Sequence, residues 1–331
     1  MAEPLAAGAE SPWVSATPEL AARLHADGAR GLARAISAVE RGDASAPELV
    51  RLLSAQTPSP AVVGLTGAPG SGKSSLAGAV VAELRARGHR VAVLAVDPSS
   101  PFSGGALLGD RIRLQRHAQD EGVYIRSLAA RGHLGGLSPV IRDAIRLVAG
   151  FGFDTVILET VGVGQSELEV ASVAETTIVV LAPGFGDGIQ LMKAGVMEIA
   201  DIYCLNKADL SGADQLRGDL RGFIASLHKR PWAPPLVATV ATTGQGVGDL
   251  WEAVERHRAR IADLPEAEGR RSQRLCDEAA ELVGGWARRQ AVRILEEDSS
   301  LRGELEAGND PQAVLARLAE RLRWPGPGGT G

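Results

Sequence analysis

Gly67-Ala68-Pro69-Gly70-Ser71-Gly72-Lys73-Ser74 is the stretch that decides the fold. It matches the pattern GxxxxGK[ST] and stands between an apolar run and a segment able to start a helix. In such a loop the glycines let successive backbone N–H groups face phosphates, and the following helix N-terminus adds a favourable dipole. We expect Lys73 to neutralise the β- and γ-phosphates, Ser74 to ligate Mg²⁺, and the neighbouring Ser75 to belong to the same loop. The alternative, a glycine-rich turn that holds Lys-Ser by chance, is the weaker interpretation because a strand precedes the loop.

Short apolar runs alternate with helical segments from residue 61 onward, and they read as strands buried on both faces. Helices between such strands imply βα crossovers, so the sequence predicts an α/β fold of the P-loop NTPase type with a mostly parallel central sheet. The predicted strands are Ala61–Thr66, Val91–Val96, Thr155–Leu158, Thr177–Leu181, Ile202–Leu205 and Leu236–Thr239.

Helical patterns flank this core on both sides. Residues 18–42 show the apolar spacing of one amphipathic helix ending at Gly42, and a second helix is expected after an N-cap at Ser45. Beyond Pro265 one long helix and another from Pro311 to Arg323 are predicted, before a Pro- and Gly-rich tail expected to be disordered. The chain is thus divided into an N-terminal helical extension (1–56), a nucleotide-binding domain (57–264) and a C-terminal helical arm with its tail (265–331).

Composition limits the classes of partner. Hydrophobic residues make up 45% and charged residues 23% of the 331 residues, as in globular proteins, and the net charge of −5 gives no reason to expect nucleic acid. No apolar run reaches the roughly 20 residues that span a bilayer, and no signal segment is recognised, so no membrane contact and a cytoplasmic location are expected. The two cysteines, Cys204 and Cys276, form no CxxC pattern, which argues against a disulfide framework or a zinc site.

Asn206-Lys207-Ala208-Asp209 follows the apolar run Ile202–Leu205, at the strand end where doubly wound sheets bind ligands. A carboxylate there accepts hydrogen bonds from guanine N1–H and the N2 amine, a donor pair that adenine lacks. Alone, the tetrapeptide reads equally well as a polar turn; after a P-loop it favours GTP and GDP. Val240-Ala241-Thr242, after the next strand, is a weaker candidate for a backbone N–H to guanine O6.

Acidic residues at strand ends are candidates for the Mg²⁺ shell. Asp97 and Glu159 each close a predicted strand, and Asp110 lies in a Gly- and Ser-rich loop able to close over the γ-phosphate. Capping of the next helix is the alternative role for Asp97 and Glu159, and a plain loop position is the alternative for Asp110. Gly162 is expected to offer its N–H to the γ-phosphate and so make Glu159–Gly162 a switch. No glutamine directly follows Gly162 to orient the attacking water, so slow intrinsic hydrolysis is expected. Gln165, three residues further on, and a group supplied by a partner are equal candidates for that role.

These motifs, with Gly109-Asp110-Arg111 and Glu159-Thr160-Val161-Gly162-Val163-Gly164-Gln165-Ser166-Glu167, resemble in order and spacing the methylmalonyl-CoA mutase-associated GTPases, the MeaB/ArgK group. The likeness covers nearly the whole chain. It implies a G-protein chaperone that gates adenosylcobalamin loading and protects or reactivates a coenzyme-B12-dependent acyl-CoA mutase. It also implies that Gly184–Lys193 is a second switch that touches the mutase, with Lys193 as its signalling residue.

The resemblance further implies that the C-terminal helices form a homodimer arm, which suits the apolar face around Leu282 and Trp286; packing of that face on the chain's own nucleotide domain is the alternative. This chain departs from the family in two places: it has Val240-Ala241 where Ser-Ala is usual, and it ends early in a Pro-Gly tail. Three other functions stay open: a metal-insertion GTPase, which needs a Cys/His cluster, an ATP-dependent small-molecule kinase, and an adaptor with an inactive site.

Overall fold

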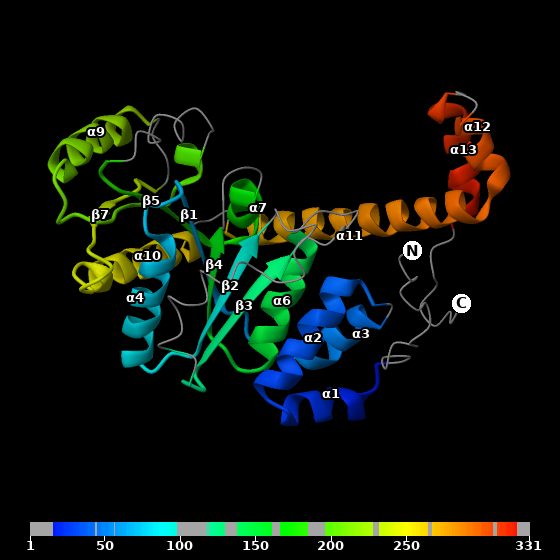
Figure 1. The fold of residues 1–331 in the computed structure, drawn as a ribbon, viewed down its shortest axis with the longest axis horizontal. Helices are drawn as coiled ribbons and strands as arrows, with labels where there is room; N and C mark the ends of the chain where they lie inside the picture. The colour runs from blue at the N-terminus through cyan, green and yellow to red at the C-terminus, as the bar shows by residue number, and fades with distance from the viewer. Residues whose placement is uncertain are drawn as a thin grey trace, which may run out of the picture.

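A computed structural model describes residues 16–43, 45–55, 57–97, 117, 119–129, 138–160, 166–184, 196–227, 232–263, 267–306 and 310–322. These residues form an α/β core from which one long helix extends, with two short helices folded at its far end (Figure 1). The predicted fold class, a P-loop type α/β core with helices added at both ends, is confirmed.

The described sheet has seven strands in the order β3-β2-β4-β1-β5-β6-β7, and all neighbouring strands pair in parallel. Sequence reasoning found six of them and missed β3, whose half-buried residues do not form a continuous apolar run. The strands are β1 (Ala61–Gly67), β2 (Val91–Asp97), β3 (Val123–Ala129), β4 (Thr155–Thr160), β5 (Thr176–Leu181), β6 (Ile202–Leu205) and β7 (Leu236–Ala238).

Helices cover both faces of the sheet and bury it from both sides. One face packs on α4 (Lys73–Ala86) and α10 (Val247–Ala262) through a cluster that includes Leu76 and Trp251. The other face carries the N-terminal helices together with α6 (Ser138–Gly150), α7 (Ser166–Val173), η2 (Val196–Ile199) and α9 (Ala213–Ser226). Because both faces are covered, the strands are nearly continuous apolar runs, which is why most of them were recognisable.

The N-terminal segment differs from the single helix that the spacing predicted. The structure has α1 (Pro18–Ala26) and α2 (Ala29–Arg41), because Gly28 takes φ +58 between them and interrupts the helix. Gly31 lets the two helices approach closely, since a Cβ there would lie 1.7 Å from the Leu24 carbonyl oxygen. Ser45 precedes α3 (Ala46–Ser54) as predicted, but its side chain makes no capping hydrogen bond. All three helices share a core with α6.

The C-terminal segment forms α11 (Ala267–Glu297), α12 (Ser299–Glu306) and α13 (Pro311–Arg321), of which α12 was not predicted. Arg142 and Arg146 on α6 form ion pairs with Glu281 and Glu278 on α11. Leu282 and Val283 are 45% and 48% exposed, so the nucleotide domain of the same chain does not cover these two side chains, whereas Trp286 is half-buried. Figure 1 shows α11 running past α6 toward α12 and α13.

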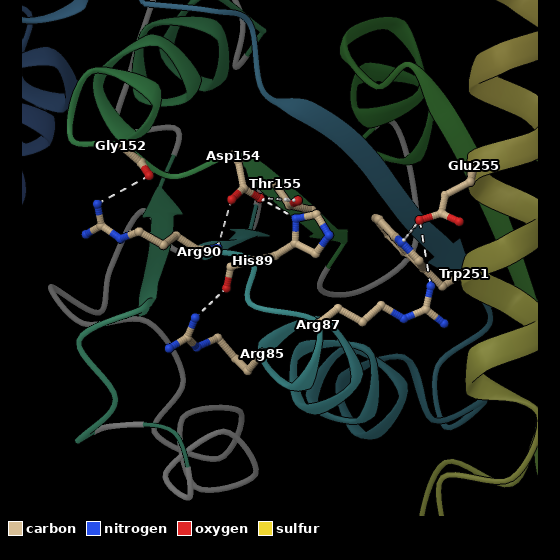
Figure 2. Close-up of polar contacts among 9 residues, drawn as sticks. All are labelled: Arg85, Arg87, His89, Arg90, Gly152, Asp154, Thr155, Trp251 and Glu255. Carbon is tan, nitrogen blue, oxygen red and sulfur yellow. Dashed lines mark hydrogen bonds and ion pairs between the residues drawn. The ribbon is translucent and has the colours of Figure 1, made fainter.

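Polar contacts tie the chain together at the edge of the sheet opposite the phosphate loop (Figure 2). The Asp154 carboxylate accepts hydrogen bonds from the Arg90 amide at 3.0 Å and the Thr155 hydroxyl at 2.8 Å, and it pairs with His89 Nδ1 at 3.0 Å. Arg85 bonds the His89 carbonyl oxygen and so links α4 to the same turn. These contacts fix the turn that leads from α4 into β2.

Burial alone would raise the pKa of Asp154, but its hydrogen bonds outweigh burial and hold that pKa below the usual value. A carboxylate with a lowered pKa stabilises the fold fully at pH values above its pKa in the unfolded chain. This stabilisation is lost as the pH falls through its lower pKa in the folded protein. We expect Asp154→Asn to lower the free energy of unfolding by about 0.5–1 kcal/mol at pH 7, a small value because the carboxylate is half-exposed and screened by solvent. The difference should shrink below about pH 4 in urea unfolding curves. Asp219→Asn on α9 is the control; a constant difference across pH would contradict the assignment.

Candidate nucleotide-binding site

The predicted site residues converge at the carboxyl edge of the sheet. The phosphate loop follows β1, which lies between β4 and β5 where the strand order changes direction, and Asn206–Asp209 follows β6. Ligands bind at such a switch point because loops from adjacent strands diverge there. The structure therefore brings together the phosphate loop, Glu159 at the end of β4, Asn206 and the Val240-Ala241 turn after β7.

Glycine is required at two points of the phosphate loop. Gly67 has φ +139, and a Cβ there would lie 2.1 Å from the Val180 carbonyl oxygen on β5. Gly72 has φ +92, and a Cβ there would lie 2.5 Å from Asn206 Nδ2. The backbone of the phosphate loop is thus held against β5 at Gly67 and against Asn206, just after β6, at Gly72, and the two glycines allow the loop between them to curl.

Lys73 and the start of α4 form the cationic end of the loop. The Lys73 ammonium donates to the carbonyl oxygens of Gly67 at 2.6 Å and Ala68 at 3.2 Å, and the residue is 8% exposed. Gly72 precedes the helix and has no side chain that could cap the first amides of α4. An anion placed here meets both the ammonium and the helix N-terminus.

Ser74 and Glu159 form a pair of oxygen donors suited to a hard cation. The Ser74 hydroxyl donates to Glu159 Oε1 at 2.5 Å, and the two residues are 8% and 2% exposed. A hydroxyl and a carboxylate at this spacing are ligands that Mg²⁺ takes in proteins, so the residues present fit that ion. Asp97, the third predicted ligand, ends β2, which pairs with β4 at this same edge.

Asn206 connects three loops of the site. Its Nδ2 donates to the Ser71 carbonyl oxygen at 2.9 Å, and its Oδ1 accepts from the Thr239 hydroxyl and the Ala241 amide, both at 3.2 Å. The residue is 1% exposed. The Ala241 amide, which the sequence suggested for guanine O6, is therefore directed to Asn206 in this structure, and Thr242 beside it is exposed.

Thr239 is a residue of this network that sequence reasoning missed. It is buried, its hydroxyl contacts both Asn206 and Cys204, and its carbonyl oxygen accepts from the Ala208 amide at 3.1 Å. Its position directly before Val240-Ala241 was the available signal. Burial raises the pKa of Cys204 to about 12, so this thiol is neutral and part of the packing below the site.

Lys207 and Asp209 lie at the rim. Among the described residues Lys207 is the one non-glycine residue with positive φ, +57, and its ammonium donates to the Gly70 carbonyl oxygen at 2.8 Å. A left-handed conformation costs roughly 1–2 kcal/mol and persists at functional sites where the surroundings hold it. Asp209 is exposed at the end of the same turn, where its carboxylate is accessible to a ligand.

Several predicted residues lie outside the described part of the chain. They are Asp110, Gly162, Gln165 and all of the Gly184–Lys193 loop after its first residue. Of the remaining loop residues, Pro69 and Gly70 are exposed, whereas Ala68 and Ser71 are buried. The buried hydroxyls of Thr66 and Ser71 have no hydrogen-bond partner among the residues that the structure describes.

The described residues contain no group of three or more His, Cys, Asp or Glu side chains arranged to hold a metal ion. Nor does any described helix combine the length and apolar character needed to cross a membrane.

Comparisons with known proteins give a consistent result. Residues 32–292 match the family model described as methylmalonyl Co-A mutase-associated GTPase MeaB. A putative GTPase of Pyrococcus horikoshii is 42% identical over 92% of this chain and 98% of its own length. GTPase ArgK of Escherichia coli is 37% identical over 69% and 68% of the two chains. The mouse methylmalonic aciduria type A homolog, a mitochondrial protein, is 36% identical over 63% and 52%.

Among solved structures, one titled as a LAO/AO transport system kinase superposes with a TM-score of 0.64. It is 26% identical and covers 92% of this chain and 96% of its own. The superposition supports the fold over most of the chain.

Proposed function

This chain belongs to the family of methylmalonyl-CoA mutase-associated GTPases, and on that premise we propose that it is a GTP-dependent chaperone of a coenzyme-B12-dependent acyl-CoA mutase. It is a P-loop GTPase. Hydrolysis of GTP to GDP and phosphate would control adenosylcobalamin loading and the protection or reactivation of the mutase. The family match favours this function over metal insertion or a small-molecule kinase.

The observation that carries the nucleotide part is the convergence of Lys73, the start of α4 and Asn206 on one loop. Lys73 is held by the carbonyl oxygens of Gly67 and Ala68, positions from which its ammonium can turn to β- and γ-phosphate oxygens. The exposed Asp209 carboxylate would select guanine. We propose that the backbone amides of the phosphate loop bind the phosphates. We also propose that the aliphatic part of the Lys207 side chain packs against the guanine base while its ammonium stays bonded to the Gly70 carbonyl oxygen.

Ser74 and Glu159 would hold Mg²⁺, with Asp97 and Asp110 proposed as further members of its shell. The ion would neutralise charge on the β- and γ-phosphates. Glu159 keeps the Ser74 hydroxyl oriented toward the phosphate side through their 2.5 Å hydrogen bond. Gly162 and Gln165 remain proposed contacts to the γ-phosphate and to water.

The partner part of the proposal is supported by the family's association with methylmalonyl-CoA mutase and by the similarity to the mouse homolog. It predicts slow GTP hydrolysis by the chain alone, because the attacking water and the transition-state charge then lack a group supplied by the partner. Candidate clients are methylmalonyl-, isobutyryl-, hydroxyisobutyryl- and ethylmalonyl-CoA mutases.

Saturating client mutase should raise the GTPase rate at least about tenfold, since a charge supplied in trans is worth much more in P-loop enzymes. Phosphate release would be measured with each candidate mutase, with Lys73→Ala as the control for turnover at this site. A rate that no candidate changes would contradict the chaperone role, and phosphate release absent even with the partner would favour the inactive adaptor.

The other regions receive proposed roles. We assign residues 57–264 to the nucleotide, 265–331 to homodimerisation and 1–56 to support of the sheet. Exposed Leu282 and Val283 on α11 suit a surface that a second copy covers. The proposed compartment is the cytoplasm.

A further inference from the structure

Gly64, in the middle of β1, lies directly under α7. A Cβ built on Gly64 would lie 3.0 Å from Val170 Cγ1 and 3.1 Å from the Cβ of Ala174, the residue after the last turn of α7. Val170 is fully buried and Ala174 is 9% exposed. Contacts this short are tighter than a methyl group normally makes, so a side chain at Gly64 would require α7 to move away from the sheet by a few tenths of an ångström.

The reason for glycine at this position is steric and not conformational. Gly64 is absent from the described glycines with positive φ, and it pairs in regular register with Leu158 on β4 and Thr177 on β5. Alanine can adopt this strand conformation. A substitution here therefore acts through the distance between β1 and α7.

The position of α7 matters because of what it joins. It begins at Ser166, six residues after the end of β4 at Thr160, and the Glu159 carboxylate on β4 accepts from the Ser74 hydroxyl. α7 is therefore the first described element after the predicted switch Glu159–Gly162. It also packs on η2, the first described element after the predicted switch Gly184–Lys193.

We propose that Gly64 is a positioning residue for GTP hydrolysis: it seats α7 against β1 and so fixes the point at which the chain that leaves β4 after Glu159 is anchored to the sheet. Gly64 stands three residues before Gly67 on the same strand, so β1 both leads into the phosphate loop and contacts α7. The inference takes from the proposed site that the segment after Glu159 faces the γ-phosphate. It does not depend on the identity of the client.

The test is Gly64→Ala, measured without a partner by single-turnover GTP hydrolysis and by the affinities for GTPγS and GDP. A shift of α7 by a few tenths of an ångström should lower the hydrolysis rate about tenfold and weaken GTPγS. GDP should bind as before, because the loop amides and Lys73 are untouched. Gly222→Ala, at an exposed helical position with nothing within 4 Å of the new Cβ, is the matched control and should change neither value.

A second substitution distinguishes displacement of α7 from a general loss of stability. Val170→Ala removes the Cγ1 atom that the new methyl group meets, so Gly64→Ala with Val170→Ala should recover most of the lost rate. Val170→Ala alone, which loosens the same contact from the helix side, should lower the rate several-fold and provides the test if Gly64→Ala does not fold. Equal loss of GDP and GTPγS affinity, absence of rescue, or wild-type rates in folded variants would each overturn the proposal.

Discussion

Lys73→Ala is expected to weaken GTP binding at least about 100-fold, since it removes a charge-assisted bond to phosphates from a site shielded from water. In the structure its ammonium is 8% exposed and is held by the carbonyl oxygens of Gly67 and Ala68. Those carbonyls lose a donor in the variant, which costs about 1–2 kcal/mol of stability and leaves the fold intact. Calorimetric titration with GTP-Mg²⁺ measures the affinity, and a thermal melt checks the fold.

Lys73→Met is the matched variant, because it keeps the apolar stem in the loop and removes only the charge. Both variants should lose affinity alike if the ammonium is what the phosphates require. A folded Lys73→Ala protein that still binds GTP tightly would refute the phosphate-loop assignment.

Asp209→Asn is expected to exchange the base preference of the site. The carboxylate accepts from guanine N1–H and N2, whereas an amide offers an N–H that faces the guanine amine. GTP affinity should fall about 100-fold or more, since polar groups at a recognition site are left unpaired. Xanthosine triphosphate, which carries a carbonyl oxygen at C2, should bind the variant better than GTP does.

Competition titrations with GTP, ATP and xanthosine triphosphate on the wild type and the variant measure this change. Asp214→Asn is the matched control: Asp214 is a neighbouring, 92% exposed carboxylate paired with Arg217, and the variant should keep its GTP affinity. A wild-type protein that binds ATP and not GTP would contradict the base assignment together with the chaperone function.

Local sequence patterns did not predict two features of the fold, the strand β3 and the break between α1 and α2. The β3 strand carries Arg126, whose guanidinium reaches Ser37 and Glu40 on α2, so a charged side chain interrupts the strand and its sequence lacks a continuous apolar run. The break at Gly28 was invisible for the opposite reason, because apolar spacing continues on both sides of it. A tertiary contact outweighed the apolar pattern at Arg126, whereas the backbone conformation of Gly28 outweighed it between α1 and α2.

The sequence by itself determined the phosphate loop, the α/β class and the positions of six strands along the chain, because backbone curvature, burial on two faces and crossover helices each leave a mark in neighbouring residues. Tertiary structure decided which residues meet across the loops: Thr239 with Asn206, Ser74 with Glu159 and Gly64 with Val170. Those contacts join residues far apart in the chain, and their distances depend on how helices and strands pack, which no local pattern encodes.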